Sequence, residues 1–133
     1  MINKTKKILS EISAGELLDK ISILEIKLYK IKNKNSYNQI NKEYKMLKKV
    51  KKSNIKLTIK IKKLIVEIKK INLNLWNIED KIRIHEKNKD FKVEFIKLAR
   101  SVYLKNDRRA KIKSQINKLS KSNINEVKQY IKY

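Results

Sequence analysis

The sequence predicts an all-α protein: an elongated antiparallel helical bundle with coiled-coil-like hairpins, four main helices and a short C-terminal helix. The chain has no proline and one glycine in 133 residues. Turns in hairpins, sandwiches and phosphate-binding loops depend on these two residue types, so their scarcity favours helices. Apolar residues that recur every three or four positions over long stretches support the same class.

The first helical hairpin is predicted over 14–51. Ser13 and Glu16 have the spacing of a capping box, which satisfies free amides at a helix start. One apolar seam follows, formed by Leu17, Ile21, Leu24, Leu28 and Ile31. The capping spacing returns from Ser36 to Gln39 and predicts the start of a shorter helix that weakens near residue 51.

A second, longer hairpin is predicted over 55–119. Its first residues alternate apolar and polar in the manner of a strand. The apolar repeat then continues to His85 over roughly 45 Å, and only a helix keeps such a repeat on one face, in a left-handed, coiled-coil-like packing. The repeat consists of Leu57, Ile61, Leu64, Ile68, Ile71, Leu75, Ile78 and Ile82.

The return helix of this hairpin is predicted to begin at a cap formed by Asp90. A short connection makes the two helices antiparallel, which places Trp76 level with Arg100. Lys105 and Arg109 stand where apolar residues are expected, so a polar layer interrupts the seam.

The remaining segments complete one predicted domain, 1–133. Residues 1–12 are an N-terminal extension, and Asn123 and Glu126 have the spacing to cap a short helix within the C-terminal segment 123–132.

Charge is unevenly distributed along the chain. The formal net charge is +23, and residues 27–70 carry sixteen lysines against two acids, a net +14. Such a surface binds phosphate backbones through counterion release, independently of base sequence. Lys, Ile and Asn make up about half of the chain, a composition typical of A+T-rich genes. We therefore favour compositional drift on solvated helix faces as the origin of the lysine excess.

Several classes of site are excluded by composition. The absence of cysteine excludes disulfides, thiolate metal sites and cysteine nucleophiles, and one histidine cannot form a histidine metal cluster. The acids are interleaved with lysines that compete for them, so we predict no metal and no cofactor. The N-terminus lacks the apolar run of a signal peptide and no stretch is apolar enough to span a bilayer, which predicts a cytoplasmic protein.

Two groups of polar residues share helix faces, because residues three and four apart are neighbours on a helix. They are Trp76, Glu79, Asp80 and Arg83, and Arg100, Tyr103, Asp107 and Arg108. All four arginines of this lysine-rich chain lie at or beside these groups, and arginine binds carboxylates or phosphates through two hydrogen bonds. Either the acids neutralise the arginines in a structural network, or arginines face a cleft and bind an anion. We favour the network.

Three blocks of the sequence resemble the domain-of-unknown-function family numbered 6165. They are SAGELLDKISILEIK, NLWNIEDKIR and FIKLARSVYLKNDRRAKIKSQIN, in this order from residue 13 onward. The resemblance implies a helical protein without assigned activity, in an accessory role beside sugar-transfer enzymes of surface-polysaccharide assembly. The chain departs from the family pattern in its lysine-rich middle and its lack of prolines.

The resemblance also implies a set of ligand- or partner-binding residues. They are Glu16, Asp19, Lys20, Glu25, Trp76, Glu79, Asp80, Arg83, Arg100, Tyr103, Asn106, Asp107, Arg108 and Arg109.

We predict a non-enzymatic interaction module that binds a protein partner or an anionic group. The long apolar seams make a homodimer a further prediction. Two alternatives stay open. One is sequence-independent nucleic-acid binding through residues 27–70. The other is an enzyme whose helical arginines hold a small anionic substrate. A closed, basic, partly apolar pocket containing Arg83 and Arg100 would favour it, and fully paired arginines on a flat surface would argue against it.

Overall fold

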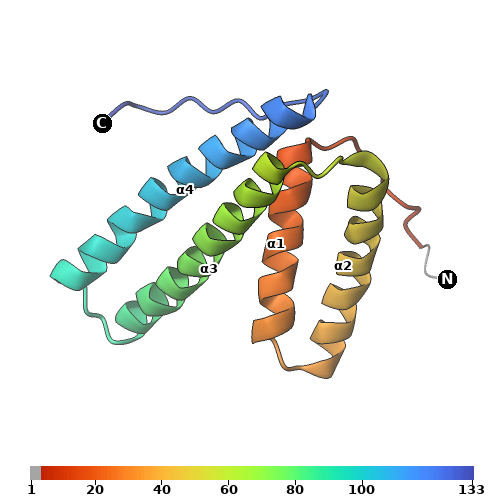
Figure 1. Cartoon of the computed structure of the whole chain (residues 1–133). Coiled ribbons are helices and arrows are strands. Elements are labelled where there is room, and N and C mark those ends of the chain that lie inside the picture. Colours follow the sequence, from red (N-terminus) through yellow and green to blue (C-terminus); the bar gives the residue numbers. More distant parts are fainter. Residues whose placement is uncertain (1–3) are drawn as a thin grey trace.

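The computed structural model describes residues 4–133, and all regular structure in this range is helical. The helices are α1 (Ala14–Lys30), α2 (Lys34–Asn54), α3 (Ile59–Lys87) and α4 (Val93–Ser120). The predicted all-α class with four main helices is confirmed. Figure 1 shows consecutive helices running in opposite directions, with α1 between α2 and the α3–α4 pair. α1 contacts all three other helices, whereas α2 contacts only α1 within the described range.

The predicted capping box at the start of α1 forms in part. The Ser13 side chain accepts a hydrogen bond from the Glu16 amide at 3.1 Å. For α2, the prediction of a cap at Ser36 is wrong, because Asn33 is the N-cap and its side chain accepts from the Ser36 amide at 3.0 Å. Asparagine caps helices as well as serine does, so the helix begins at the earlier of the two suitable residues.

The starts of α3 and α4 also differ from the predictions. Thr58 caps α3 by accepting from the Ile61 amide at 3.2 Å, so the alternating residues 55–58 form the connection and lie outside the helix. Asp90 does not cap α4: its carboxylate accepts from the Lys92 amide at 3.2 Å, within the turn before the helix. The carboxylate accepts a hydrogen bond within this local turn, as aspartate side chains commonly do, so it does not reach the amides of the first helical turn.

The short helix predicted within the C-terminal segment 123–132 does not form, and residues 123–133 are irregular. Two of the apolar side chains that such a helix would have to bury, Val127 and Ile131, are 89% and 92% exposed. Short helices depend on the packing of their apolar side chains for their stability. Polar contacts attach the segment instead: Glu126 accepts from Lys113 at 3.2 Å and Tyr133 donates to Asp107 at 2.5 Å. We call residues 123–133 the tail; Figure 1 shows it running back alongside α4.

The apolar core lies where α1, α3 and α4 meet. Its buried members are Leu18, Ile61, Ile68, Ile71, Ile112 and Ile116. Gly15 permits the close approach of α1 to α4, because a Cβ at this position would lie 2.5 Å from the Lys113 carbonyl oxygen. The Gly15 amide donates to the Asn117 side chain at 2.6 Å. This junction places the next turn of α1 directly against α4.

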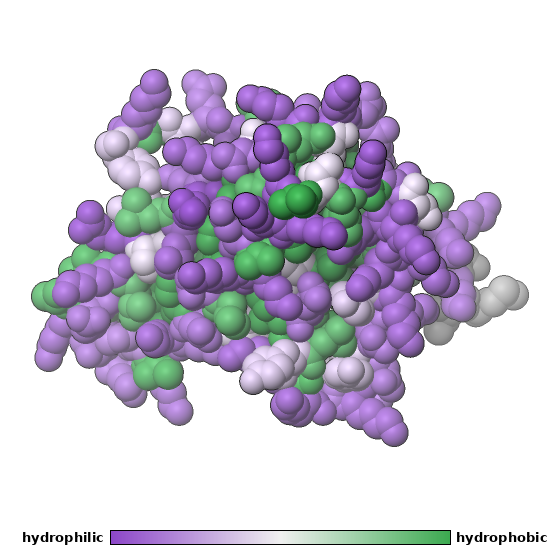
Figure 2. Space-filling view, in the orientation of Figure 1, coloured by the Kyte–Doolittle hydropathy of each residue, from purple (hydrophilic) through white to green (hydrophobic). Residues whose placement is uncertain are grey.

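No helix in the described range is long and apolar enough to span a membrane. Figure 2 shows hydrophilic side chains over much of the visible face, with apolar side chains between them.

Candidate functional site

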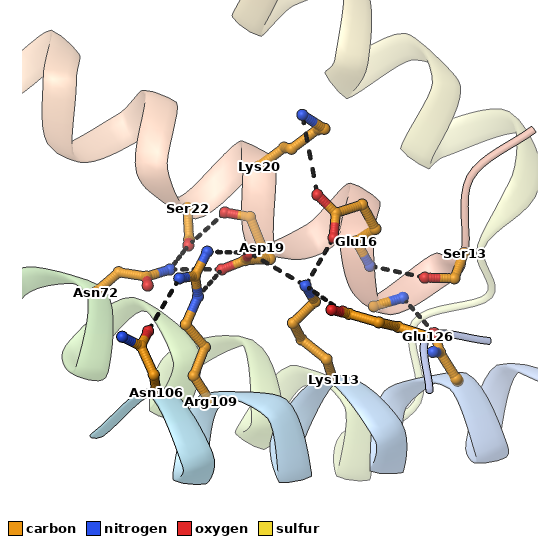
Figure 3. Close-up of polar contacts among 12 residues, drawn as sticks. Ser13, Glu16, Asp19, Lys20, Ser22, Asn72, Asn106, Arg109, Lys113 and Glu126 are labelled. Atoms are coloured by element: carbon orange, nitrogen blue, oxygen red, sulfur yellow. Dashed lines mark hydrogen bonds and ion pairs between the residues drawn. The ribbon is translucent and has the colours of Figure 1, made fainter. Parts of the chain in front are cut away.

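A buried carboxylate, Asp19 of α1, is the centre of a polar network that joins three helices (Figure 3). Its side chain is only 1% exposed. Oδ1 accepts from Arg109 Nε of α4 at 3.0 Å and from Asn72 Nδ2 of α3 at 2.8 Å, and Oδ2 accepts from Arg109 Nη2 at 2.5 Å. We call Asp19, Asn72, Arg109, Lys113 and the groups bonded to them the Asp19 network.

Arg109 binds Asp19 with two parallel hydrogen bonds, a geometry that lysine cannot reproduce. The hydrogen bonds that Arg109 donates to Asp19 raise the pKa of Arg109, although its partial burial lowers it. Its remaining terminal nitrogen, Nη1, lies 3.4 Å from Asn106 Oδ1. The guanidinium charge is therefore balanced inside the protein, as expected for a pair that fixes the register of packed helices.

Lys113 connects the network to the tail. Its ammonium group is 2.6 Å from Glu16, 3.2 Å from Glu126 and 3.7 Å from Asp19. Burial alone would lower the pKa of Lys113, but the hydrogen bonds to Glu16 and Glu126 outweigh it and the pKa is raised. The same hydrogen bond from Lys113 lowers the pKa of Glu126.

Asn72 is 6% exposed and has unused hydrogen-bonding capacity. Its amide nitrogen donates to Asp19 at 2.8 Å and to Ser22 Oγ at 2.7 Å, and Ser22 donates to the Asp19 carbonyl at 2.8 Å. Among residues 4–133 no donor contacts the Asn72 side-chain oxygen. This oxygen is not fully buried, and Asn72 lines the cleft described next, so the acceptor is available to a ligand.

A cleft of about 490 Å³ lies beside the network, between α1, α3 and α4. Its residues are Ile23, Ile26, Asn72, Leu75, Trp76, Glu79, Asp80, Arg83, Asn106 and Arg109. Trp76 is half-buried, and the next turn of α3 adds two acids and Arg83, which donates to Glu79. We call this space the α1–α3–α4 cleft; it combines an aromatic ring, aliphatic side chains and polar groups, the usual composition of a ligand pocket.

The structure brings some of the residues expected from the sequence to this cleft and its network. These are Trp76, Glu79, Asp80, Arg83, Asn106 and Arg109 in the cleft, and Glu16 and Asp19 in the network. Lys20 is at the edge, where it pairs with Glu16 at 3.9 Å on the exposed side of α1.

Other expected residues lie elsewhere. Glu25 pairs with Lys69 at 3.7 Å, and Arg108 pairs with Glu67 at 3.8 Å. Tyr103 and Asp107 contact the tail, where the Tyr103 and Tyr133 rings are 5.5 Å apart.

Arg100 does not line the cleft with Trp76. Its Nε instead lies 3.4 Å from the Tyr103 hydroxyl on an exposed part of α4. Trp76 and Arg100 were predicted to lie at the same height of the hairpin. Two such residues do not share a cleft when the side chain of one points away from the other helix.

Several members of the network carry no distinctive sequence signal. They are Ser22, Asn72 and Lys113; the spacing of Glu126 predicts only a helix cap. Asparagine and lysine are so common in this chain that a buried one looks like its exposed neighbours. A polar residue within an apolar stripe was the one available signal, and it identified Arg109.

The arrangement can bind polar groups but holds no candidate metal cluster: residues 4–133 contain no group of three or more His, Asp or Glu side chains close enough to ligate an ion. Both arginines in the cleft are paired with carboxylates.

Among comparisons with known proteins, only the one with protein families finds a match. Neither the curated proteins nor the solved structures contain a match to the chain. A family model, described as a family of unknown function (DUF6165), matches residues 8–132. Because this match covers nearly the whole sequence, the chain belongs to the DUF6165 family.

Proposed function

We propose that the protein is a non-enzymatic binding module whose α1–α3–α4 cleft receives an uncharged, hydroxyl-rich group, such as part of a glycan. In this proposal it is an accessory protein of glycosyl-transfer or surface-polysaccharide systems. One observation carries the proposal: the cleft arginines are neutralised internally, while amide, carboxylate and indole groups remain free to bond a ligand.

The charge of the cleft argues against an anionic ligand. Arg109 is held by Asp19 and Arg83 by Glu79. Asp80 has no ion pair within the described chain, so the one unpaired charge in the lining is negative. An anion at Arg109 would have to displace Asp19, and separating this buried pair costs several kcal/mol. The Arg83–Glu79 pair is exposed and weaker, so the argument against an anion rests mainly on Arg109.

The free groups suit hydroxyls, which donate and accept hydrogen bonds at once. The Asn72 oxygen and the Asp80 carboxylate are acceptors, and the Asn106 amide and Trp76 indole N–H are donors. The flat face of Trp76 also offers apolar area for the C–H side of a sugar ring. The cleft volume of about 490 Å³ lies within the range of small-molecule sites.

The positions of the carboxylates support binding without catalysis. Hydrolysis of a glycosidic bond uses two carboxyl groups on opposite sides of the bond. Glu79 and Asp80 are consecutive residues of one helix, and Glu79 is engaged by Arg83. A closed pocket shared by Arg83 and Arg100 would have favoured the enzyme alternative, and Arg100 does not line the cleft.

A thermal-shift screen tests the proposal. The compounds are neutral mono- and disaccharides, the corresponding sugar phosphates, and dicarboxylates. We expect neutral saccharides at concentrations well above Kd to raise Tm, because ligands that bind only the folded state stabilise it.

The Trp76→Leu variant should lose this shift. A matched control, Leu73→Ala, changes an exposed residue one turn away that does not line the cleft, and should keep it. Stabilisation by sugar phosphates alone, or an equal response of the Trp76 variant, would reject the proposed ligand class.

A further inference from the structure

The lysines of residues 27–70 have almost no acidic partners within residues 4–133. Of the sixteen in this range, only Lys69 forms an ion pair there, with Glu25 at 3.7 Å. Some of the others have uncharged partners: Lys32 donates to the Tyr29 carbonyl at 3.0 Å, and the Lys48 ammonium lies 5.5 Å from the Tyr44 ring centre. In contrast, Lys113 is held by three acids on the opposite side of the core. The positive charge of this region is therefore directed to solvent, without neutralisation by the protein.

On α2 six of the seven lysines occupy one face; the seventh, Lys51, lies apart from them and is only partly exposed. Lys42, Lys45, Lys49 and Lys52 follow each other at steps of three, four and three residues, which keeps them in line on a helix. Lys34 and Lys48 lie on the same side, so that six lysines fall within about 120° of the helix circumference. All six are exposed. We call Lys34, Lys42, Lys45, Lys48, Lys49 and Lys52 the lysine stripe.

The opposite exposed face of α2 carries no lysine. It consists of Gln39, Glu43, Met46 and Val50, and Glu43 is the one acid of the helix. Compositional drift places lysine at any solvated position, so it predicts lysines on both exposed faces. The exposed lysines are instead confined to one of the two exposed faces. This contradicts the expectation from drift and indicates that the stripe has a partner.

The position of α2 leaves this stripe accessible. Among the helices of residues 4–133, α2 contacts only α1, and it has no buried residue. The right-hand side of Figure 2, over α2, is covered mainly by hydrophilic side chains. A helix of this length extends about 31 Å, and its four aligned lysines, from Lys42 to Lys52, follow each other at about 5 Å along its axis.

We propose that the lysine stripe binds the phosphate backbone of a nucleic acid without sequence specificity. A line of lysines matches a linear polyanion, because each ammonium group is a point charge that approaches phosphate oxygens from many directions. The stripe contains only asparagines between its lysines, at Asn38 and Asn41. A helix that lies on an anionic membrane instead directs an apolar face to the lipid, and the inner apolar face of α2 already packs on α1.

The experiment measures binding of a labelled oligonucleotide of roughly 20 bases, single-stranded and duplex, at about 50 to 200 mM salt. If six phosphates are neutralised, log K should fall against log salt with a slope of about −4 for single strands and about −5 for duplex. Different base sequences should bind equally.

Two charge-matched variants separate the stripe from the overall charge. K42Q/K45Q/K49Q/K52Q removes four charges from the stripe; K81Q/K87Q/K92Q/K118Q removes four exposed, unpaired charges elsewhere. The stripe variant should reduce the salt slope by about 3 and weaken binding at least 100-fold at the lowest salt. The control should lose less than tenfold.

Three results would overturn the proposal: equal losses in both variants, no nucleic-acid binding by the wild type at 50 mM salt, or binding to anionic vesicles alone. Circular dichroism establishes that the substitutions leave the helices intact, and a second variant, K34Q/K45Q/K52Q, provides an independent removal of the stripe. Trp76→Leu should bind nucleic acid like the wild type, so this proposal and the cleft proposal fail independently.

Discussion

Arg109 and Asp19 lie 90 positions apart and form a buried two-bond ion pair, with Nε–Oδ1 at 3.0 Å and Nη2–Oδ2 at 2.5 Å. The pair ties α1 to α4, and Asn72 ties the same carboxylate to α3 at 2.8 Å. The three helices that line the α1–α3–α4 cleft are therefore held together by the side chain of Asp19.

Asp19→Asn should destabilise the fold strongly. The change leaves Arg109 and Lys113 without the buried charge that balances them, and breaking a buried pair typically costs 3–5 kcal/mol. Urea unfolding followed by the fluorescence of Trp76, the single tryptophan, measures the change in the free energy of unfolding.

The control for this change is Glu67→Gln, which removes the partner of Arg108 in an exposed pair at 3.8 Å. Exposed pairs contribute about 0–1 kcal/mol, so this variant should unfold almost like the wild type. Equal effects of the two substitutions would mean that the Asp19 network does not hold the helices together.

Gly15→Ala should also destabilise the protein, although alanine favours helices. At an exposed helical site the change stabilises by about 0.5–1 kcal/mol. At Gly15 the new Cβ would lie 2.5 Å from the Lys113 carbonyl oxygen and push α1 away from α4. We expect a net loss of about 1–3 kcal/mol in urea unfolding; a gain in stability would show that the helices are not in close contact here.

Acidification should release residues 123–128 of the tail from α4. The hydrogen bond from Lys113 lowers the pKa of Glu126, so its contribution is present above the ordinary glutamate pKa near 4.3. That contribution is lost as the pH falls through the lower folded-state value. Lys113 stays charged over this pH range, so the release of the tail reports protonation of the Glu126 carboxylate.

NMR chemical shifts of the Val127 and Lys128 amides, followed from pH 6 to pH 2, measure this release. Glu126→Gln should give shifts close to those of the released state at every pH. If the variant titrates as the wild type does, a group other than Glu126 holds this part of the tail.

The helices were predictable because their apolar repeats are local. The serine cap of α1 and the polar residue at position 109 were identified for the same reason. Exact starts were less predictable, since Asn33 and Ser36 are equally good caps and only the folded chain selects between them. The elongated bundle with coiled-coil-like packing, and the homodimer, stay predictions.

The partner of Arg109 was not predictable from periodicity. A short connection implies that α3 and α4 are antiparallel, but nothing in the repeats indicates where α1 crosses this pair. Asp19 therefore appeared as a site residue through family resemblance and not as an ion-pair partner. Asn72 was missed because asparagine is common in this chain, and burial is the property that distinguishes it.

The most direct test of the cleft proposal is the emission of Trp76 during titration with a neutral disaccharide and, separately, with its phosphorylated form. Because Trp76 is the one tryptophan and lines the cleft, any ligand there changes its surroundings. We predict a saturable change with the neutral sugar and a weaker response to the phosphorylated sugar. A stronger response to the phosphorylated form, or no response to either at millimolar concentrations, would contradict a cleft whose arginines are internally paired.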